Sequence, residues 1–400
     1  SLYRFFHVKQ NISYCNIYLM SQFSPRVTKP PPTLRQKRSH EKLEILGAFS
    51  HLSQEEKDVL KYPSISTDYA AGKDDSISKY IQPIGIASNF KINNTEYLIP
   101  FVSQEVSSTA MTNILSHSAK VAKVRGGFSS LVSGSTIRGQ MIVINTNVET
   151  AMEHLETNKQ KLMDTANIVH QSLRRMQKGV MDITWREVIP RNDSSHKTPF
   201  LVIELRVDVG DHMPNQIIPS IFEKIHPMVE TITKGNILLS STSDYTTERT
   251  VTVFATFDRT MTGGDRVVDR ILAAYELAEQ DPYRAINHNK DIITGIRGVA
   301  MATGQDTAAL EAAAHVYACR YNTYRTLSTW TKNESGHLVG IVDIPMSVGI
   351  VDDDSTPHPI ARPCTNMLKL GDSDDLAGVI GAVGLAYHYA CLRETVKEQG

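Results

Sequence analysis

The residue types most able to do chemistry lie in one segment, Asp281 to Asp306, which reads DPYRAINHNKDIITGIRGVAMATGQD. It places a cation, Lys290, and an acid, Asp306, on two ordered elements in a Gly- and Ala-rich setting. An ammonium group can stabilise charge on an oxygen atom, and a carboxyl group can hold or deliver a proton. The segment therefore has the composition of a catalytic core. The alternatives are a solvent-exposed lysine and an aspartate that only caps a helix.

Two helices must position these groups. Asp281-Pro282 predicts an N-cap followed by proline at the first helical position, so Arg284, His288 and Lys290 are expected on a helix or at its end. A second helix is predicted to start after Asp306 and to run through TAALEAAAHVYACR.

Earlier segments predict further elements. Residues 41–60 favour two short amphipathic helices, with Ser53 and Glu56 spaced as a capping box. Two β-rich runs around Asn93-Asn94 indicate strand, turn and strand, and a helix is expected from about Ser107.

The stretch from about 132 to 255 predicts an inserted unit of β-α-β-β-α-β order, with TVTVFATF as its last strand. This order is typical of a split, ferredoxin-like sheet with helices on one face. No GxGxxG follows any expected strand, which disfavours a Rossmann dinucleotide site.

Composition narrows the class of protein. The 400 residues carry a net charge of −1, which offers no basic field for nucleic acid. No apolar run approaches the roughly 20 residues that span a bilayer, so a soluble, cytoplasmic protein is expected. The four cysteines lack CxxC spacing and the histidines lack metal-ligand spacing, so we expect neither a disulfide framework nor a metal.

Residues 1–40 differ from the rest, with seven Lys or Arg and no Asp or Glu. We expect a basic, poorly ordered tail. The alternative is a transit peptide for import into an organelle.

Several motifs occur in the order in which a known family has them. They are IGIASNFKIN, VSQEVSS, RGGF, VDVGDHM, HNK, ATGQD, ACRYNTYRTLSTW, HLVGIVDIPMSVGIV, HPIA and AVGLAYHYACLRE. In these the chain, over roughly residues 40 to 400, resembles 3-hydroxy-3-methylglutaryl-coenzyme A (HMG-CoA) reductase of the soluble class II type.

The resemblance implies an α+β fold that is not Rossmann: a large, mainly helical substrate domain, an inserted ferredoxin-like nucleotide-binding domain and a C-terminal flap. The implied large domain comprises 41–131 and 256–354, and the small NAD(P)H-binding domain comprises 132–255. The flap would be 355–400 and is short in this sequence. The active site of the family lies between two subunits, which implies a homodimer.

The implied reaction reduces HMG-CoA to mevalonate and free coenzyme A by two hydride transfers through mevaldehyde. By this resemblance Lys290 stabilises the oxyanion, Glu105 supplies a proton, Asp306 links these two groups, and His358 protonates the coenzyme A thiolate.

Binding roles are implied as well. Arg284, Ser107 and Asn289 match substrate positions, and Asp211 and Met213 match a cofactor loop. His170 stands where NAD-using relatives have an aspartate, with Arg174 beside it, so NADPH is expected over NADH. The alternative for these two residues is that they are solvated on an exposed helix face.

Some residues depart from the family pattern. Pro214 replaces a glycine in the loop Asp211–Gln216, three acids occupy Asp352–Asp354, and Gln305 and Asp244 replace asparagines. These departures leave two other hypotheses open: a catalytically impaired paralogue that binds coenzyme A thioesters, and a reductase of a related acyl-coenzyme A.

Overall fold

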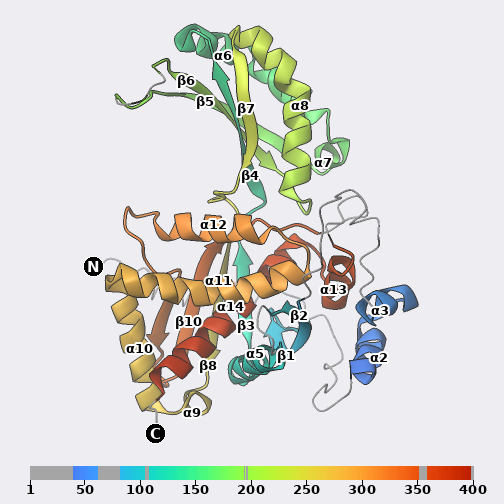
Figure 1. Cartoon of the computed structure of the whole chain (residues 1–400), viewed down its shortest axis with the longest axis vertical. Coiled ribbons are helices and arrows are strands. Elements are labelled where there is room, and N and C mark those ends of the chain that lie inside the picture. Colours follow the sequence, from blue (N-terminus) through green and yellow to red (C-terminus); the bar gives the residue numbers. More distant parts are fainter. Residues whose placement is uncertain are drawn as a thin grey trace, which may run out of the picture.

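The computed structural model describes residues 39–61, 82–103, 108–192, 194, 197–350 and 358–397. Two units stand one above the other in Figure 1, each with its own sheet. The larger unit has the strand order β2-β1-β3-β8-β10-β9. Its strands are β1 (Ile84–Ile92), β2 (Thr95–Val102), β3 (Phe128–Val132), β8 (Thr250–Phe257), β9 (Ser328–Lys332) and β10 (Leu338–Pro345). The α+β prediction is confirmed.

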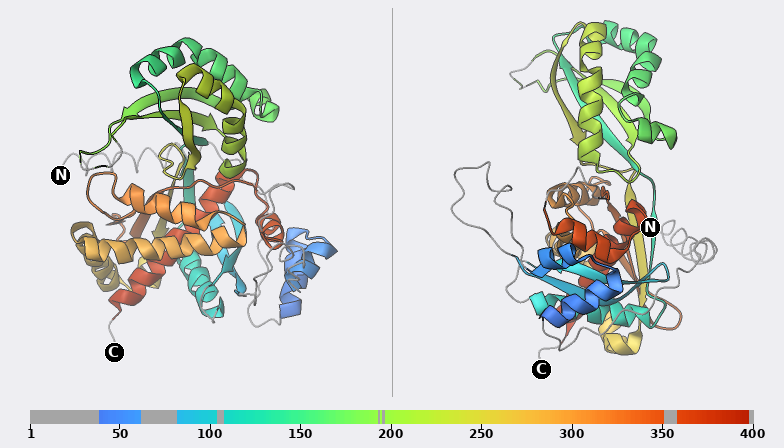
Figure 2. Two further views of the ribbon diagram at one scale, coloured as in Figure 1. Left: turned by 45° about the horizontal axis from the view of Figure 1, so that its top comes forward. Right: turned by 90° about the vertical axis from the view of Figure 1, so that its right-hand side faces the viewer.

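The smaller unit is a four-stranded antiparallel sheet of order β5-β6-β4-β7. Its chain order is β4 (Thr136–Ile144), α6 (Val148–Asn167), α7 (Gln171–Arg175), β5 (Gly179–Val188), β6 (Phe200–Asp208), α8 (Pro214–Thr233) and β7 (Asn236–Ser243). Helices α6 and α8 lie together on one side of the sheet (Figure 2). This is the split β-α-β arrangement expected from the sequence.

One strand assignment was wrong. Thr250–Phe257, expected to close the inserted sheet, instead pairs with β3 and β10 in the larger sheet. Its alternate residues, from Val251 to Phe257, are buried in the core of the larger unit. The closing strand of the small sheet is β7, whose sequence NILLSSTS is largely exposed and weakly patterned. The predicted boundary at residue 255 thus falls inside β8. The rest of the range 132–255 stays a prediction.

Helix α14 (Ser373–Val396) forms the centre of the larger unit, where it packs against α11 and the sheet. Among the described helices, its length and composition are those of a possible membrane span, but 83% of the apolar window is buried inside the fold. A helix apolar on all sides needs such burial. The range predicted for the flap, 355–400, therefore includes a helix that is buried in the larger unit, and its assignment as a flap stays a prediction.

Two predicted local motifs are confirmed. Ser53 and Glu56 form the capping box of α3 (Gln54–Lys61), in which each backbone N–H donates to the other side chain, at 2.8 and 3.2 Å. Asn93 and Asn94, both with positive φ, make the tight turn between β1 and β2. Helix α2 (Ser39–Ser50) and α3 pack on α13 (Ala361–Leu368).

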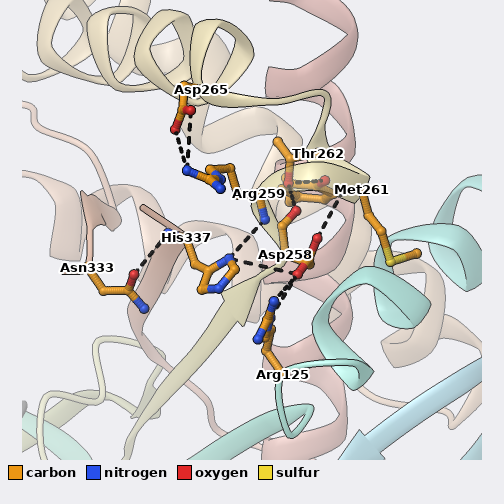
Figure 3. Close-up of polar contacts among 9 residues, drawn as sticks. Arg125, Asp258, Arg259, Met261, Thr262, Asp265, Asn333 and His337 are labelled. Carbon is orange, nitrogen blue, oxygen red and sulfur yellow. Dashed lines mark hydrogen bonds and ion pairs between the residues drawn. The ribbon is translucent and has the colours of Figure 1, made fainter. Parts of the chain in front are cut away.

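A buried aspartate joins three segments at the far end of the larger sheet. Asp258 follows β8 and caps α9 (Arg259–Thr262) by accepting from Met261 N at 3.0 Å. Arg125, from the loop between α5 (Ser108–Lys123) and β3, donates to the same carboxylate at 2.5 and 2.8 Å (Figure 3). His337 lies 3.8 Å away, just before β10. The carboxylate thus ties α5, β8 and β10 together.

Candidate active site

Helix α11 (Pro282–Ala302) carries the predicted catalytic lysine. Asp281 caps it by accepting from Tyr283 N at 3.0 Å, and Pro282 starts it, as the sequence predicts. Lys290 is exposed in this single chain, and Arg284 is half-buried one and a half turns earlier. Burial raises the pKa of the neighbouring Asp291, although Lys290 and Arg284 oppose that rise.

Asn289, predicted to bind substrate, has its amide engaged inside the protein. The side chain is fully buried, donates to Arg325 O and accepts from Leu327 N, both at 2.8 Å. Asn289 therefore fixes the segment before β9 against α11.

The residue before it, His288, belongs to a buried histidine pair. Its ring lies 4.0 Å from that of His388 on α14, and Ser328 hydrogen-bonds to both rings, at 2.7 and 3.4 Å. Burial, and then the charge of Arg284, lower the pKa of His288 to about 3. Both rings are neutral at neutral pH, because burial also holds the pKa of His388 well below its ordinary value.

Asp306 is the N-cap of α12 (Thr307–Ala318), where it accepts from Ala309 N at 3.0 Å. The rest of its carboxylate is exposed. Burial, and then the charge of Asp306, raise the pKa of Asp244, which follows β7. The chain returning from the small unit therefore brings a second acid to the predicted catalytic aspartate.

Lys290 and Asp306 are held apart by α11 itself. At about 1.5 Å per residue, the helix from Lys290 to Ala302 rises about 18 Å. Helix α12 then turns back along α11, and Arg297 pairs with Glu311 at 3.6 Å (Figure 1). Among the described residues no ion pair joins Lys290 to Asp306. The two groups are therefore not paired within one chain.

The predicted cofactor loop lies where the two units meet. Asp211 accepts from Ser373 N, at the start of α14, at 2.9 Å, and its carbonyl accepts from Ile350 N at 2.8 Å. Met213 is the N-cap of α8, and Pro214 is its first residue. A proline there costs no helical hydrogen bond, which explains how the fold accommodates this departure.

The second predicted cofactor region is a shallow hollow. Its volume is about 350 Å³, and Ile168, Gln171, Arg174 and Arg175 line it. His170, next to these residues, is held by Ser220 Oγ at 2.7 Å from Nε2, and burial lowers its pKa. The positive charge at the hollow therefore comes from the two arginines.

The remaining predicted residues have fewer contacts. His358 is exposed and accepts from Ile360 N through Nδ1 at 3.2 Å, at the entrance to α13. Glu105, Ser107 and the acids Asp352–Asp354 lie outside the described residues. No group of three or more potential metal ligands occurs in the described part of the chain.

Sequence reasoning missed one residue that supports the site. Arg249 is buried at the point where the chain re-enters the larger unit, and it donates to Ser373 Oγ at 3.0 Å and Gly210 O at 3.4 Å. Its hydrogen bonds thus hold the loop that carries Asp211 against the start of α14. A single arginine before a strand gives no sequence signal of this role.

Comparison with known proteins identifies the family. Residues 38–399 match the family model described as hydroxymethylglutaryl-coenzyme A reductase. The chain is 33% identical over 360 residues to the 3-hydroxy-3-methylglutaryl-coenzyme A reductase of Archaeoglobus fulgidus, covering 90% of this chain and 80% of that protein. It is 24% identical over 377 residues to a probable reductase of the same name from Borreliella burgdorferi, covering 90% and 81%.

Solved structures give the same result. The chain is similar to 3-hydroxy-3-methylglutaryl-coenzyme A reductase from Streptococcus pneumoniae, with a TM-score of 0.80 at 28% identity, covering 91% of this chain and 87% of that one. A structure of the class II enzyme from that organism, bound to NADPH in open conformations, has a TM-score of 0.79 at 28% identity and coverages of 90% and 98%.

Proposed function

The chain belongs to the hydroxymethylglutaryl-coenzyme A reductase family, and we propose that it performs the family reaction as a homodimer that prefers NADPH to NADH. That reaction converts HMG-CoA to mevalonate and coenzyme A. The proposal on assembly is carried by the placement of Lys290 on α11 and of Asp306 at the cap of α12, with no ion pair between them in the described part of one chain. The proposal on the cofactor is carried by the arginine-lined hollow.

The hollow fits a nucleotide phosphate. Arg174 and Arg175 supply two guanidinium groups, which bind phosphate oxygens well, and none of the described residues that line the hollow is an acid. An acid there would instead accept hydrogen bonds from a ribose hydroxyl and repel a phosphate. The relative from S. pneumoniae has been solved bound to NADPH. When bound, the nicotinamide supplies hydride to the carbonyl carbon.

The chain's own residues supply charge and protons. The Lys290 ammonium stabilises the negative charge that forms on the substrate oxygen. Arg284, on the same helix, offers a guanidinium for the substrate carboxylate. Asp306, with Asp244 beside it, holds a proton-accepting or proton-donating carboxyl at the entrance to α12.

The homodimer would complete the site. Lys290 shares an exposed face of α11 with Tyr283 and Ile286, whose side chains are 86% and 42% exposed. Residues at this spacing lie on one side of a helix. A second copy packed on this face would bury the aromatic and aliphatic groups and place Lys290 of one subunit near Asp306 of the other. It would also remove water from the ammonium, which strengthens its effect on an oxyanion.

The test is a spectrophotometric assay that follows oxidation of NADPH, and separately of NADH, with HMG-CoA as substrate. We expect turnover with a lower KM for NADPH, and loss of turnover in Lys290→Ala. Saturable binding of HMG-CoA without turnover would favour the catalytically impaired paralogue. Turnover of another thioester in a panel, but not of HMG-CoA, would favour a reductase of a related acyl-coenzyme A.

A further inference from the structure

Gln305, the residue before Asp306, is buried and its side-chain amide is fully engaged. Nε2 donates to Gly349 O and to Thr303 O, and Oε1 accepts from Gly349 N, each at 3.0 Å. One amide thus pairs with both backbone groups of Gly349, as a neighbouring strand would. Gln305 itself is fixed by the turn that ends α11, in which its N–H donates to Ala300 O at 2.8 Å.

The segment that Gln305 holds lies directly on the cofactor loop. A Cβ atom on Gly349 would come within 2.8 Å of the His212 carbonyl and of Met213 N, so the two backbones touch. The next residue, Ile350, donates its N–H to Asp211 O at 2.8 Å. Gln305 is therefore next to Asp306 in the sequence. Its side chain holds Gly349, whose backbone contacts the cofactor loop directly.

From this geometry we infer that Gln305 is a positioning residue that sets the place of the loop Asp211–Met213 relative to Asp306. This inference rests on the proposed function, because it assigns the loop to the nicotinamide cofactor. A glutamine is long enough to reach across the gap to Gly349. An asparagine, which is one methylene shorter, could not keep all three bonds from the same backbone position, so the departure from the family residue has a structural role.

Removal of the amide should therefore weaken nucleotide binding specifically. In Gln305→Leu, a side chain of similar size cannot make the three bonds, and Gly349 loses its partners on that side. We expect the Kd for NADPH, measured by fluorescence titration, to rise about tenfold, which is the effect of losing about one net hydrogen bond. The Kd for HMG-CoA should change less than twofold. Gln160→Leu, the same change on the exposed face of α6, should leave both constants unchanged.

Gln305→Glu separates positioning from general loss of packing. A protonated glutamic acid can donate to Gly349 O and accept from Gly349 N, whereas a carboxylate repels the two carbonyl oxygens. We expect its defect in NADPH affinity, relative to wild type at the same pH, to be smaller at pH 6 than at pH 8. This variant also serves if Gln305→Leu does not fold.

Unchanged NADPH affinity in both variants would overturn the inference, as would an equal loss of affinity for NADPH and HMG-CoA. Failure of the wild-type chain to bind NADPH would instead contradict the proposed function. The binding readout does not need turnover, so the two failures are distinguishable.

Discussion

Lys290 lies on α11 and Asp306 caps α12, and α11 rises about 18 Å between Lys290 and its last residue, Ala302, although the proposed chemistry needs both groups at one carbonyl group. Helix α11 is straight in Figure 1 and its end is closed by the turn at Gly304, so bending does not bring them together. A site made from two subunits removes the difficulty, because the lysine and the aspartate then come from different chains.

This arrangement predicts complementation between inactive variants. Lys290→Ala and Asp306→Asn should each abolish turnover alone. In a mixture equilibrated between subunits, half of the dimers are mixed and one of their two sites is intact, so activity should return to about 25% of wild type. The measurement is HMG-CoA-dependent NADPH oxidation before and after subunit exchange. The control is the double variant mixed with either single variant, and this mixture should stay inactive. If the mixture of the two single variants never regains activity, both residues act in the site of one subunit.

The arginine-lined hollow on the small unit predicts that the protein distinguishes NADPH from NADH. Arg174→Ala removes one of two guanidinium groups near the proposed 2′-phosphate, so the KM for NADPH should rise about tenfold while the KM for NADH changes less than twofold. Steady-state kinetics with each nucleotide provide the measurement. Arg191→Ala, an exposed arginine between β5 and β6, is the matched control. Equal effects on NADPH and NADH would show that Arg174 contacts a part common to both.

Short-range signals in the sequence predicted the local structure well. The caps Asp281 and Asp306 and the turn Asn93-Asn94 depend on a few neighbouring residues, and each is where it was expected. The assignment of β8 to the wrong sheet has a different origin. Strand alternation reports burial on one face, but it does not identify the neighbouring strand, which for β8 is β10, far along the chain.

The sequence predicted which residue types the site contains better than it predicted their contacts. Lys290 was expected to stabilise an oxyanion, and it is exposed in one chain. Asn289 was expected to face the substrate, yet its amide is engaged by Arg325 and Leu327. A motif specifies which side chains are present. Their partners depend on segments that meet only in the folded chain.

The buried histidine pair predicts acid sensitivity. His288, with a pKa of about 3, and His388 are neutral when folded but bind protons below about pH 6.5 when unfolded. The unfolded state therefore gains protons as pH falls from 6.5 toward 3, and stability falls by up to about 1.4 kcal/mol per pH unit for each histidine.

Replacement of one ring tests this linkage. His388→Asn should be less stable than wild type at pH 7, and the difference in unfolding free energy should narrow as pH is lowered to 5. Urea titrations at several pH values measure it. His51→Asn, at an exposed residue with φ of 56°, which asparagine also adopts, is the control and should show a constant difference. A difference for His388→Asn that does not vary with pH would contradict the linkage.

Replacement of Asp258 should lower the stability of the fold strongly. It is 6% exposed, caps α9 and accepts from Arg125, so Asp258→Ala removes a cap and leaves the guanidinium without its buried partner. We expect a loss of about 3 kcal/mol in unfolding free energy. Asp258→Asn keeps a capping oxygen and should lose about half as much.

The pH dependence of this effect has a definite sign. The backbone N–H of Met261, and then Arg125, hold the pKa of Asp258 below its ordinary value of 3.8. The contribution of Asp258 to stability is therefore fully present above that pH and is lost as pH falls through the folded-state pKa. The unfolding free energies of wild type and Asp258→Asn should then converge in strong acid.

The control is Asp265→Ala in the same region (Figure 3). This aspartate lies 3.3 Å from Arg259 with its side chain 60% exposed, so its loss should change stability by less than about 0.5 kcal/mol. Equal losses for the two aspartates would show that burial of Asp258 does not strengthen its ion pair.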